Sequence, residues 1–465
     1  AKPTQTARYA AEELVKHINL STGVKLAIEP ESGLDDQIQT HVYIGETETA
    51  LRYGIDVASL PREAFIMRSV GNDLFIVGKE SEADPMDESN PNVGTLFGVY
   101  NFLEKYIGVR WLWPGDLGTY VPRLKTVEIS AVHTLGAPAL QYRKMRWHII
   151  GRIAAGGKLD PQDEMLGFSQ DVAQSYGKEV GILFRRHQLG GMDCKPPTGH
   201  ETSNWWKLYG KEHPEWFALC KDGTRGNPDP RKGDESEVSF CVTNEELQDF
   251  IVSKWDGKST LVLGPIDHVG RCNCAKCRAW DSPQPANPPW FAKLMYSDTK
   301  QDVFYGQTSD RYARFWKIIR EKAMKRNPDV QISCSFIYEN EFTAPITGIK
   351  LDKNYFGEFV QWRDPHLRYF PMPGEAYEWM KQQWLGWKQT GIRMGYRPNY
   401  LHDGYVMPYF DSWQSGDFFK FAWKNGMEGA EFDSYTGQWA VQGLRLYMHM
   451  RLLSNPNLEI KDIRS

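Results

Sequence analysis

The sequence lacks several features that would define whole classes of protein. No run approaches the roughly 18 apolar residues that a membrane-spanning helix needs, and the first residues do not form a segment like a secretory signal. No G-x-G-x-x-G or P-loop motif stands between a predicted strand and a predicted helix, which argues against nucleotide binding. Basic and acidic residues nearly balance, at 55 against 59, for a net charge of -4. We therefore expect neither a membrane span nor a nucleic-acid partner.

Cysteine is scarce, and its count is odd. Seven cysteines cannot all form disulfides within one chain, so their number leaves the redox compartment open. Three of them are spaced C-x-C-x-x-C in the segment LGPIDHVGRCNCAKCRAWD, residues 263–281. Together with Cys241, which we place at the end of the neighbouring strand, Cys272, Cys274 and Cys277 would complete the four ligands of a structural zinc. Possible substitutes for Cys241 are Cys220, Cys194 and His200.

A disulfide that leaves one cysteine free is the alternative to zinc, and the spacing does not decide between them. In either case we expect a structural staple that fixes the loop carrying Asp267. A catalytic zinc would need an open coordination position and usually His-rich ligation, which this segment lacks. No cofactor is expected for catalysis.

The chain is rich in aromatic residues, with 17 Trp, 22 Tyr and 22 Phe among 465 residues. The apolar faces of pyranose rings stack on such side chains, so the composition suits a sugar-binding protein. A large aromatic core explains it equally well. The length allows two or three domains, each with its own core.

Residues 1–130 are expected to form a small α/β sandwich domain. The segment TARYAAEELVKHINLSTG is an amphipathic helix that Gly23 ends, and because a domain rarely begins with such a helix we expect a chain trimmed of an earlier strand. AFIMRSV and DLFIVG are predicted strands joined by a turn at Gly71. NVGTLFGVYNFLEKYIG is a predicted helix. We place the boundary in the segment 129–140, which contains Gly136 and Pro138.

Residues 140–465 are expected to form a (β/α)8 barrel, since apolar runs alternate with helical stretches. The runs are YRKMRWHII, GILFRRHQ, EVSFCV, TLVLGP, VQISCSFI, FGEFVQW, GIRMGY and EGAEFD. TNEELQDFIVSKW is one intervening helix, with Thr243 and Glu246 at the spacing of a capping box. SDRYARFWKIIREKAMKRNP is another.

Polar residues that directly follow these runs are the candidate site, because the carboxyl ends of barrel strands carry the active site. These residues are Asp267 and His268, Glu339 and Glu341, Trp362 and Arg363, His402 and Asp403, and Asp433 and Tyr435. Paired carboxylates suit glycosidic bond cleavage, where one protonates the leaving oxygen and another offsets the positive charge. Any single acid could instead cap the next helix, a reading that fits the whole set less well. Trp147 and His187 are further candidates to line the site.

Two parts of the sequence resemble known carbohydrate-active families. The segment from FIMRSVGNDLFIVGKE to NVGTLFGVYNFLEKYIGVRWLWPG resembles the accessory α/β domain that precedes the barrel in family 20 β-N-acetylhexosaminidases and family 67 α-glucuronidases. HPEWFAL and SFCVTNEEL, followed by GPIDHVGRCNCAKCRAWD, resemble the bacterial family called domain of unknown function 4838, which includes the endo-β-N-acetylglucosaminidases of glycoside hydrolase family 163. The likeness covers most of the chain.

The resemblance implies a bacterial glycoside hydrolase located outside the cell or in the periplasm, which degrades polysaccharide. The implied substrate is a β-N-acetylglucosaminide, with its acetamido group as the internal nucleophile. Family 20 has an Asp-Glu pair after the fourth strand, whereas this chain has Ile266-Asp267. Either Asp267 is the proton donor, or it orients the acetamido group while Glu339 or Glu341 donates the proton. A sugar-binding arginine of family 20 corresponds to Arg143 or Arg146.

Two other functions remain open at this point. A uronic-acid glycosidase would need a basic pocket, which Arg363 and Arg397 could provide. A glycan-binding protein that has lost its catalytic acids is the non-enzymatic alternative. Linkage, exo or endo action, and oligomeric state do not follow from the sequence.

Overall fold

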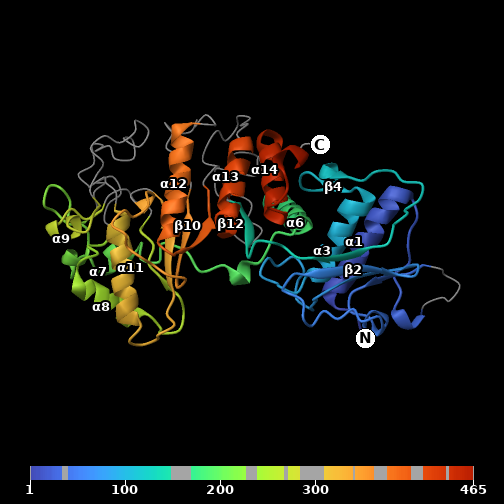
Figure 1. Cartoon of the computed structure of the whole chain (residues 1–465), viewed down its shortest axis with the longest axis horizontal. Helices are drawn as coiled ribbons and strands as arrows, with labels where there is room; N and C mark the ends of the chain where they lie inside the picture. Colours follow the sequence, from blue (N-terminus) through green and yellow to red (C-terminus); the bar gives the residue numbers. More distant parts are fainter. Residues whose placement is uncertain are drawn as a thin grey trace. The chain divides into compact units, whose positions relative to one another are not determined.

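The structure, a computed structural model, describes residues 2–33, 40–147, 169–226, 238–266, 271–282, 308–338, 341–360, 374–398, 412–435 and 439–463. The chain forms two compact units (Figure 1). The first unit comprises Ala1–Lys195, Gly404–Asp417 and Asp433–Ser465, and the second comprises Pro196–Asp403 and Phe418–Phe432. The predicted boundary near residues 129–140 thus falls inside the first unit.

A four-stranded sheet organises the N-terminal part of the first unit. Its strand order is β1 (Val42–Ile44), β3 (Asp73–Gly78), β2 (Phe65–Val70) and β6 (His133–Gly136). The β2–β3 hairpin is antiparallel, with Val70 opposite Asp73, which confirms the predicted turn at Gly71. The φ angle of Gly71 is 60°, a left-handed conformation that glycine adopts without steric cost.

Two helices cover one face of this sheet, as Figure 1 shows. Helix α1 (Gln5–Thr22) starts at the N-cap Thr4, whose side chain accepts a hydrogen bond from the Ala7 amide, and it ends at Gly23 in the left-handed conformation. Helix α3 (Gly94–Phe102) packs on β2, β3 and α1, and its chain continues in a π-helical turn, Leu103–Ile107. Both predicted helices are confirmed.

Helix α6 (Gln170–Arg186) corrects the prediction that GILFRRHQ is a barrel strand. Ser169 caps the helix, and Val180, Leu183 and Phe184 recur at helical spacing to form its buried face. The short contiguous run looked like a strand because its helical partners lie further upstream. Periodicity over four to eight apolar residues cannot separate the two structures.

The C-terminal end of α6 makes buried polar contacts with the N-terminal part of the same unit. Arg186 forms an ion pair with Glu13 of α1 at 3.0 Å. The Nε of Arg185 donates a hydrogen bond to the Pro85 carbonyl oxygen at 2.9 Å. These contacts hold two buried guanidinium groups against partners that lie about a hundred residues or more away in the sequence.

Within the described residues, the chain also forms a curled, half-barrel-like parallel sheet of six strands. The order is β7 (Arg143–Trp147), β12 (Met427–Tyr435), β11 (Arg393–Tyr396), β10 (Tyr355–Phe359), β9 (Ile332–Ile337) and β8 (Leu261–Val262). Strands β8 to β12 pair in parallel. The part of β12 from Met427 to Phe432 belongs to the second unit, and its last residues belong to the first.

Six of the eight predicted barrel strands therefore correspond to strands of this sheet. The run EVSFCV is not among them in the described part of the chain: Phe240 forms an isolated antiparallel bridge with Phe217 instead. A mixed α/β fold with a half-barrel sheet is what the structure shows. The complete eight-stranded barrel stays a prediction.

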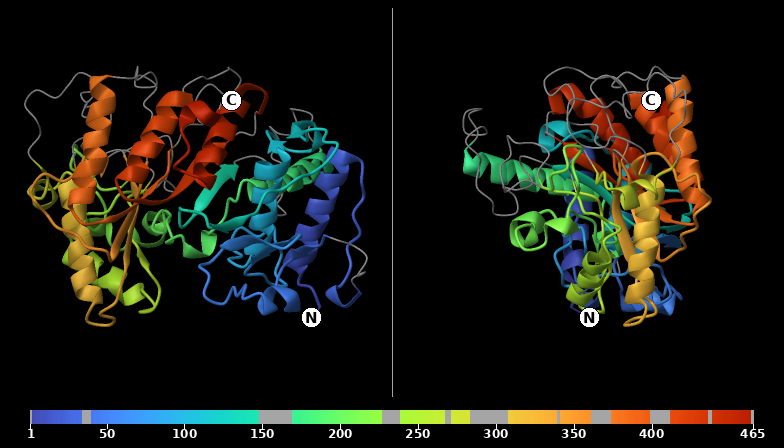
Figure 2. Two further views of the ribbon diagram at one scale, coloured as in Figure 1. Left: turned by 45° about the vertical axis from the view of Figure 1, so that its right-hand side comes forward. Right: turned by 90° about the vertical axis from the view of Figure 1, so that its left-hand side faces the viewer.

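Tryptophan side chains form much of the core of the second unit. Helix α11 (Ser309–Ala323) packs beside β9, and helix α12 (Glu375–Gln389) places Trp384 against Phe359 of β10 (Figures 1 and 2). Trp316 and Trp387 are fully buried and lie 6.2 Å apart between ring centroids. Many of the aromatic residues thus build the core rather than an exposed sugar platform.

Helix α8 (Glu245–Lys254) begins one residue later than the capping box predicted. Asn244 is the N-cap and accepts a hydrogen bond from the Leu247 amide at 2.8 Å. The hydroxyl of Thr243 instead lies 3.2 Å from the Cys277 sulfur. The remaining named helices and strands are α2 (Glu48–Arg52), α7 (Trp205–Tyr209), α9 (Ala275–Arg278), α13 (Ser412–Lys424), α14 (Trp439–Ser454), β4 (Arg110–Trp111) and β5 (Thr119–Tyr120).

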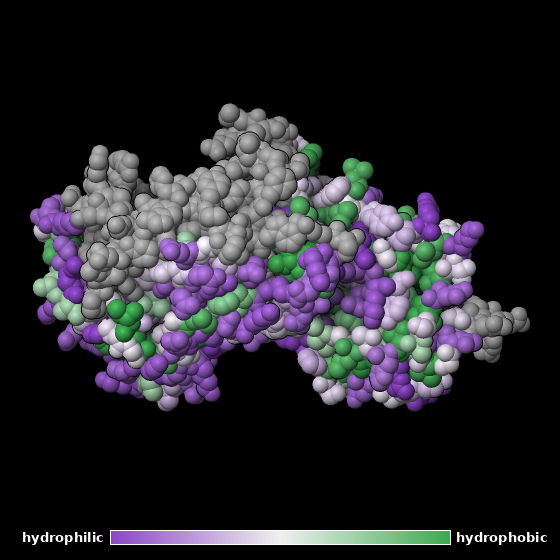
Figure 3. All heavy atoms as spheres, turned by 45° about the horizontal axis from the view of Figure 1, so that its top comes forward, coloured by the Kyte–Doolittle hydropathy of each residue, from purple (hydrophilic) through white to green (hydrophobic). Residues whose placement is uncertain are grey.

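Polar and apolar side chains are interspersed on the face of the described residues that Figure 3 draws. None of the described helices is both long and apolar enough to cross a lipid bilayer.

Candidate functional site

A fully buried carboxylate, Glu358, projects from β10 in the second unit. The hydroxyl of Thr198 donates a hydrogen bond to its Oε2 atom at 3.2 Å. Arg397 directly follows β11, and its Nε lies 4.0 Å from the same oxygen. The Arg397 guanidinium also stands 4.3 Å from the ring centroid of Phe336 on β9. A carboxylate, a guanidinium and an aromatic ring therefore meet at the carboxyl ends of three adjacent parallel strands.

His200 brings an imidazole to the same group. Its Nδ1 lies 2.9 Å from the carbonyl oxygen of Pro265, which follows β8. Because a carbonyl can only accept, Nδ1 is the donor in this contact. The ring lies 5.1 Å from that of Phe336 and 6.4 Å from that of Tyr338. We call Thr198, His200, Glu358 and Arg397 the strand-end cluster.

An irregularity in β9 makes room for the segment that carries Thr198 and His200. Ser335 has a φ of 53°, which is unusual for a residue with a side chain and marks a bulge in the pairing with β10. Its hydroxyl donates to the Gly199 carbonyl at 3.0 Å, and the Gly199 amide is 3.2 Å from the same hydroxyl oxygen. The segment is thereby fixed to the carboxyl end of β9.

Several predicted site residues lie outside the described residues. They are Asp267, His268, Glu339, Trp362, Arg363, His402 and Asp403, together with the side chains of Trp147 and Tyr435. The residues just before two of them are described. Ile266 is buried four residues beyond the end of β8, and Tyr338 is buried directly after β9. Strands β8 and β9 are parallel neighbours.

Glu341, predicted as a catalytic acid, is held inside the protein. Its side chain is 0% exposed and forms a two-pronged ion pair with Arg271, in which Nε and Nη2 each donate to one carboxylate oxygen at 2.8 Å. The Thr308 hydroxyl also donates to Oε1, at 2.6 Å. A carboxylate bound at both oxygens in this way has no free edge for a leaving group. This geometry gives Glu341 a structural role.

Arg143, predicted to bind sugar hydroxyls, is likewise enclosed. It is fully buried in the first unit and pairs with Glu63 at 2.8 Å. Its Nε donates to the Gln188 carbonyl at 2.7 Å, and its Nη1 donates to the Leu140 carbonyl at 2.8 Å. Because these donors are directed at protein oxygens, the structure assigns Arg143 to the packing of β7 rather than to a ligand.

Arg146 and Asp433 are brought together by the pairing of β7 with β12. Their closest atoms are 3.6 Å apart, and Arg146 is half exposed while Asp433 is buried. This is the only pair of predicted substrate-binding residues that the structure shows in contact among its described side chains. Arg146 therefore remains the better candidate for the predicted sugar-binding arginine.

His187, also predicted to line the site, is buried at the C-terminal cap of α6. Its Nε2 donates a hydrogen bond to the Trp111 carbonyl oxygen at 2.8 Å. Burial, with a contribution from the nearby charge of Arg451, lowers the pKa of His187 to about 3. The imidazole is therefore neutral near pH 7 and joins two parts of the first unit.

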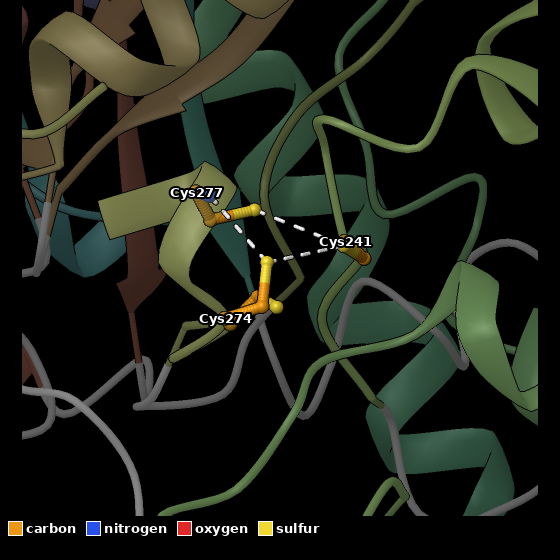
Figure 4. Close-up of side chains that lie close together, drawn as sticks. Cys241, Cys274 and Cys277 are labelled. Carbon is orange, nitrogen blue, oxygen red and sulfur yellow. Dashed lines mark hydrogen bonds between the residues drawn. The ribbon is translucent and has the colours of Figure 1, made fainter. Parts of the chain in front are cut away.

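The four cysteines of the predicted metal site do lie together in the second unit. The sulfur atoms of Cys241, Cys272, Cys274 and Cys277 are all within 4.8 Å of one another, and none of these residues is in a disulfide. Figure 4 shows three of them converging from two separate segments of the chain. Hydrogen bonds from the neighbouring thiols, Cys272 first, lower the pKa of Cys241, and the contact with Cys241 raises the pKa of Cys272 to about 12.

Glu358 and Thr198 were missed by the sequence analysis. The signal for Glu358 was a single charged residue inside the apolar run YFGEFV, since an acid in a strand buried on both faces needs a polar partner. Thr198 had no such signal, because the segment around it shows no periodicity. His200 and Arg397 were considered only as marginal members of the site.

A family model described as Domain of unknown function (DUF4838) matches residues 113–465. No curated protein matches the sequence. The solved structures that are similar include three glycoside hydrolases. One is a chitobiase from Flavobacterium johnsoniae, with 9% identity and a TM-score of 0.41, covering 99% of this chain and 66% of that one.

A family 89 glycoside hydrolase from Clostridium perfringens has 12% identity and a TM-score of 0.33, with coverage of 96% of this chain and 49% of that one. A β-N-acetylhexosaminidase from Bacteroides fragilis has 9% identity and a TM-score of 0.36, with coverage of 95% and 83%. This chain thus spans less than two thirds of the length of the first two of these proteins.

Proposed function

The chain belongs to the DUF4838 family, and we propose that it is a glycoside hydrolase whose active site lies at the carboxyl ends of β8 to β11. The strand-end cluster carries this proposal. It places a buried carboxylate, a guanidinium and an imidazole around the ends of adjacent parallel strands. In α/β sheets of this kind, ligands bind at the carboxyl ends of the strands.

We assign proton donation to Asp267, with Glu339 as the second acid. In the sequence, Asp267 directly follows the buried Ile266 and Glu339 directly follows the buried Tyr338, in the segments after the neighbouring parallel strands β8 and β9. Glu341 is left out because both its oxygens are bound to Arg271. Glu358 is 0% exposed and serves to hold Arg397 and Thr198 in place rather than to contact a sugar.

The proposed substrate is a β-linked N-acetylglucosaminide, whose acetamido group would act as the internal nucleophile. This choice follows the sequence resemblance, and with it goes export to the periplasm or the cell exterior. A uronic-acid glycoside is the second candidate, supported by Arg397 at the strand ends. Arg397 already faces Glu358, so less of its charge is available to a uronate.

A panel of para-nitrophenyl glycosides tests the proposal. We expect release of nitrophenol from the N-acetyl-β-glucosaminide and not from the α-glucuronide. Replacement of Asp267 by asparagine should reduce kcat by at least about a hundredfold, the typical contribution of a positioned proton donor. A thiazoline analogue of the bicyclic intermediate should inhibit if the acetamido group takes part.

Glu428→Gln is the matched control. Glu428 forms a two-pronged contact with Arg393. It lies at the start of β12, away from the carboxyl ends of the strands. The control should keep full turnover. If the unmodified protein binds sugar without turnover, it is a glycan-binding protein rather than a hydrolase. If Asp267→Asn is as active as the unmodified protein, a different residue is the proton donor.

A further inference from the structure

The four clustered cysteines have the spacing of a tetrahedral metal site. The Cys241 sulfur lies 3.7 Å from that of Cys274 and 3.8 Å from that of Cys277 (Figure 4). A zinc ion bound at about 2.3 Å from each of four sulfurs puts those sulfurs about 3.8 Å apart, the edge of the tetrahedron. Disulfide sulfurs are about 2.05 Å apart. Both separations match the tetrahedral geometry and are too long for a disulfide bond between these two pairs.

The surroundings supply the hydrogen bonds that metal-bound thiolates accept. The Leu219 amide donates to the Cys272 sulfur at 3.3 Å, and the Cys277 amide donates to the Cys274 sulfur at 3.4 Å. The Thr243 hydroxyl lies 3.2 Å from the Cys277 sulfur. Partners of this kind orient the ligands of a metal and offset their charge.

A cation also stands next to the four sulfurs. Arg311 donates a hydrogen bond to the Cys272 carbonyl at 2.8 Å, and it is buried together with its ion-pair partner Asp281. Four thiolates and one divalent ion carry two negative charges. Because Arg311 is already paired with Asp281, its guanidinium offsets only part of this charge.

We propose that Cys241, Cys272, Cys274 and Cys277 bind one zinc ion, and that this zinc is structural. All four tetrahedral positions are taken by the protein, so no position is open for water or substrate. Three of the four cysteines are buried, and Cys274 is half-buried. A soft, all-thiolate set at these separations suits a single tetrahedral ion.

The zinc joins two segments of the second unit that are distant in sequence, and both are hydrogen-bonded to a third, residues 216–219. Cys241 lies just before α8, and its amide donates a hydrogen bond to the Trp216 carbonyl. The other three ligands lie in the segment 272–277, where the Asn273 amide donates a hydrogen bond to the Leu219 carbonyl. Arg271, directly before the first ligand of that segment, carries the buried ion pair with Glu341. Loss of the metal would therefore loosen the segment that holds Arg271 in this ion pair.

Metal analysis of the purified full chain tests the proposal without any substrate. We expect one zinc per chain, and near-zero zinc in Cys274→Ser, which alters the least buried ligand. Cys194→Ser, at a half-buried cysteine in the first unit, is the matched control and should retain the metal. Replacement of zinc by cobalt(II) should give the intense visible bands of a tetrahedral tetrathiolate site.

The unmodified protein keeps the test decisive if Cys274→Ser does not fold. One zinc per chain, four thiols protected from alkylation until a chelator removes the metal, and a melting temperature lowered by that removal would support the site. Protein without bound metal whose four thiols all react at once would overturn it. So would a disulfide between any two of the four cysteines in a peptide map, or iron in place of zinc.

Discussion

Replacing Glu341 by glutamine is expected to destabilise the protein strongly while leaving any catalytic chemistry intact. The change keeps the size of the side chain but removes the charge opposite Arg271, which is 0% exposed. Breaking one partner of a buried ion pair costs about 3–5 kcal/mol, because the other charge stays buried without compensation. In the variant, an amide NH2 group also replaces one of the two Glu341 oxygens, so two donors, this NH2 and an N–H of Arg271, face each other.

The assay is equilibrium unfolding in urea, followed by tryptophan fluorescence. Glu428→Gln removes the charge from a contact of the same geometry with Arg393, where both side chains are 20–25% exposed. That loss should be about 1 kcal/mol or less. An arginine-free double variant, Arg271→Met with Glu341→Leu, should recover part of the stability. If Glu341→Gln unfolds like the unmodified protein but loses glycosidase activity, Glu341 is a catalytic acid after all and the structural role assigned to it is refuted.

Two further predictions concern the first unit. The pKa of His187 is 6.5 in the unfolded chain and about 3 in the folded protein. Between these pH values the unfolded state binds a proton that the folded state does not bind. The free energy of unfolding therefore falls as the pH drops from about 6.5 to about 3. The free energy of unfolding should fall by at most about 1.4 kcal/mol per pH unit. In His187→Gln, whose side chain can still donate to the Trp111 carbonyl, urea titrations at several pH values should show a smaller dependence of this free energy on pH. An equal dependence in both proteins would contradict the assignment. At Gly94 a Cβ would overlap the backbone oxygen of Ala64, so Gly94→Ala should lower the unfolding free energy by about 1–3 kcal/mol. A thermal melt unchanged by this substitution would mean that α3 does not approach β2 so closely.

Local patterns in the sequence were sufficient to predict several elements in the N-terminal part of the first unit. The turn at Gly71 and the helix α3 were predicted because a hairpin turn and a helical apolar face are set by residues within about ten positions of each other. Strands β9 and β10 were predicted for a related reason, since a strand buried on both faces is a mostly apolar run.

The candidate site was harder to predict because its partners are distant in sequence. No local pattern shows that Arg271 turns to Glu341, 70 residues away, or that Arg143 turns to Glu63, 80 residues away. Both arrangements convert a predicted functional side chain into part of the core. The cysteines are the opposite case: three of the four are neighbours in the sequence, and only Cys241 had to be inferred from the expected order of strands.

The contacts at the end of α6 set where this protein can be divided. A fragment cut near residue 140 would contain Glu13, Glu63 and the Trp111 carbonyl but would lack Arg186, Arg143 and His187, so it would bury two acids without their cations. The N-terminal part therefore belongs with α6, and also with the C-terminal segment Asp433–Ser465 of the same unit, whose Arg451 forms an ion pair with Glu104. Swapping this domain between relatives would likewise require the donor's α6 to travel with it.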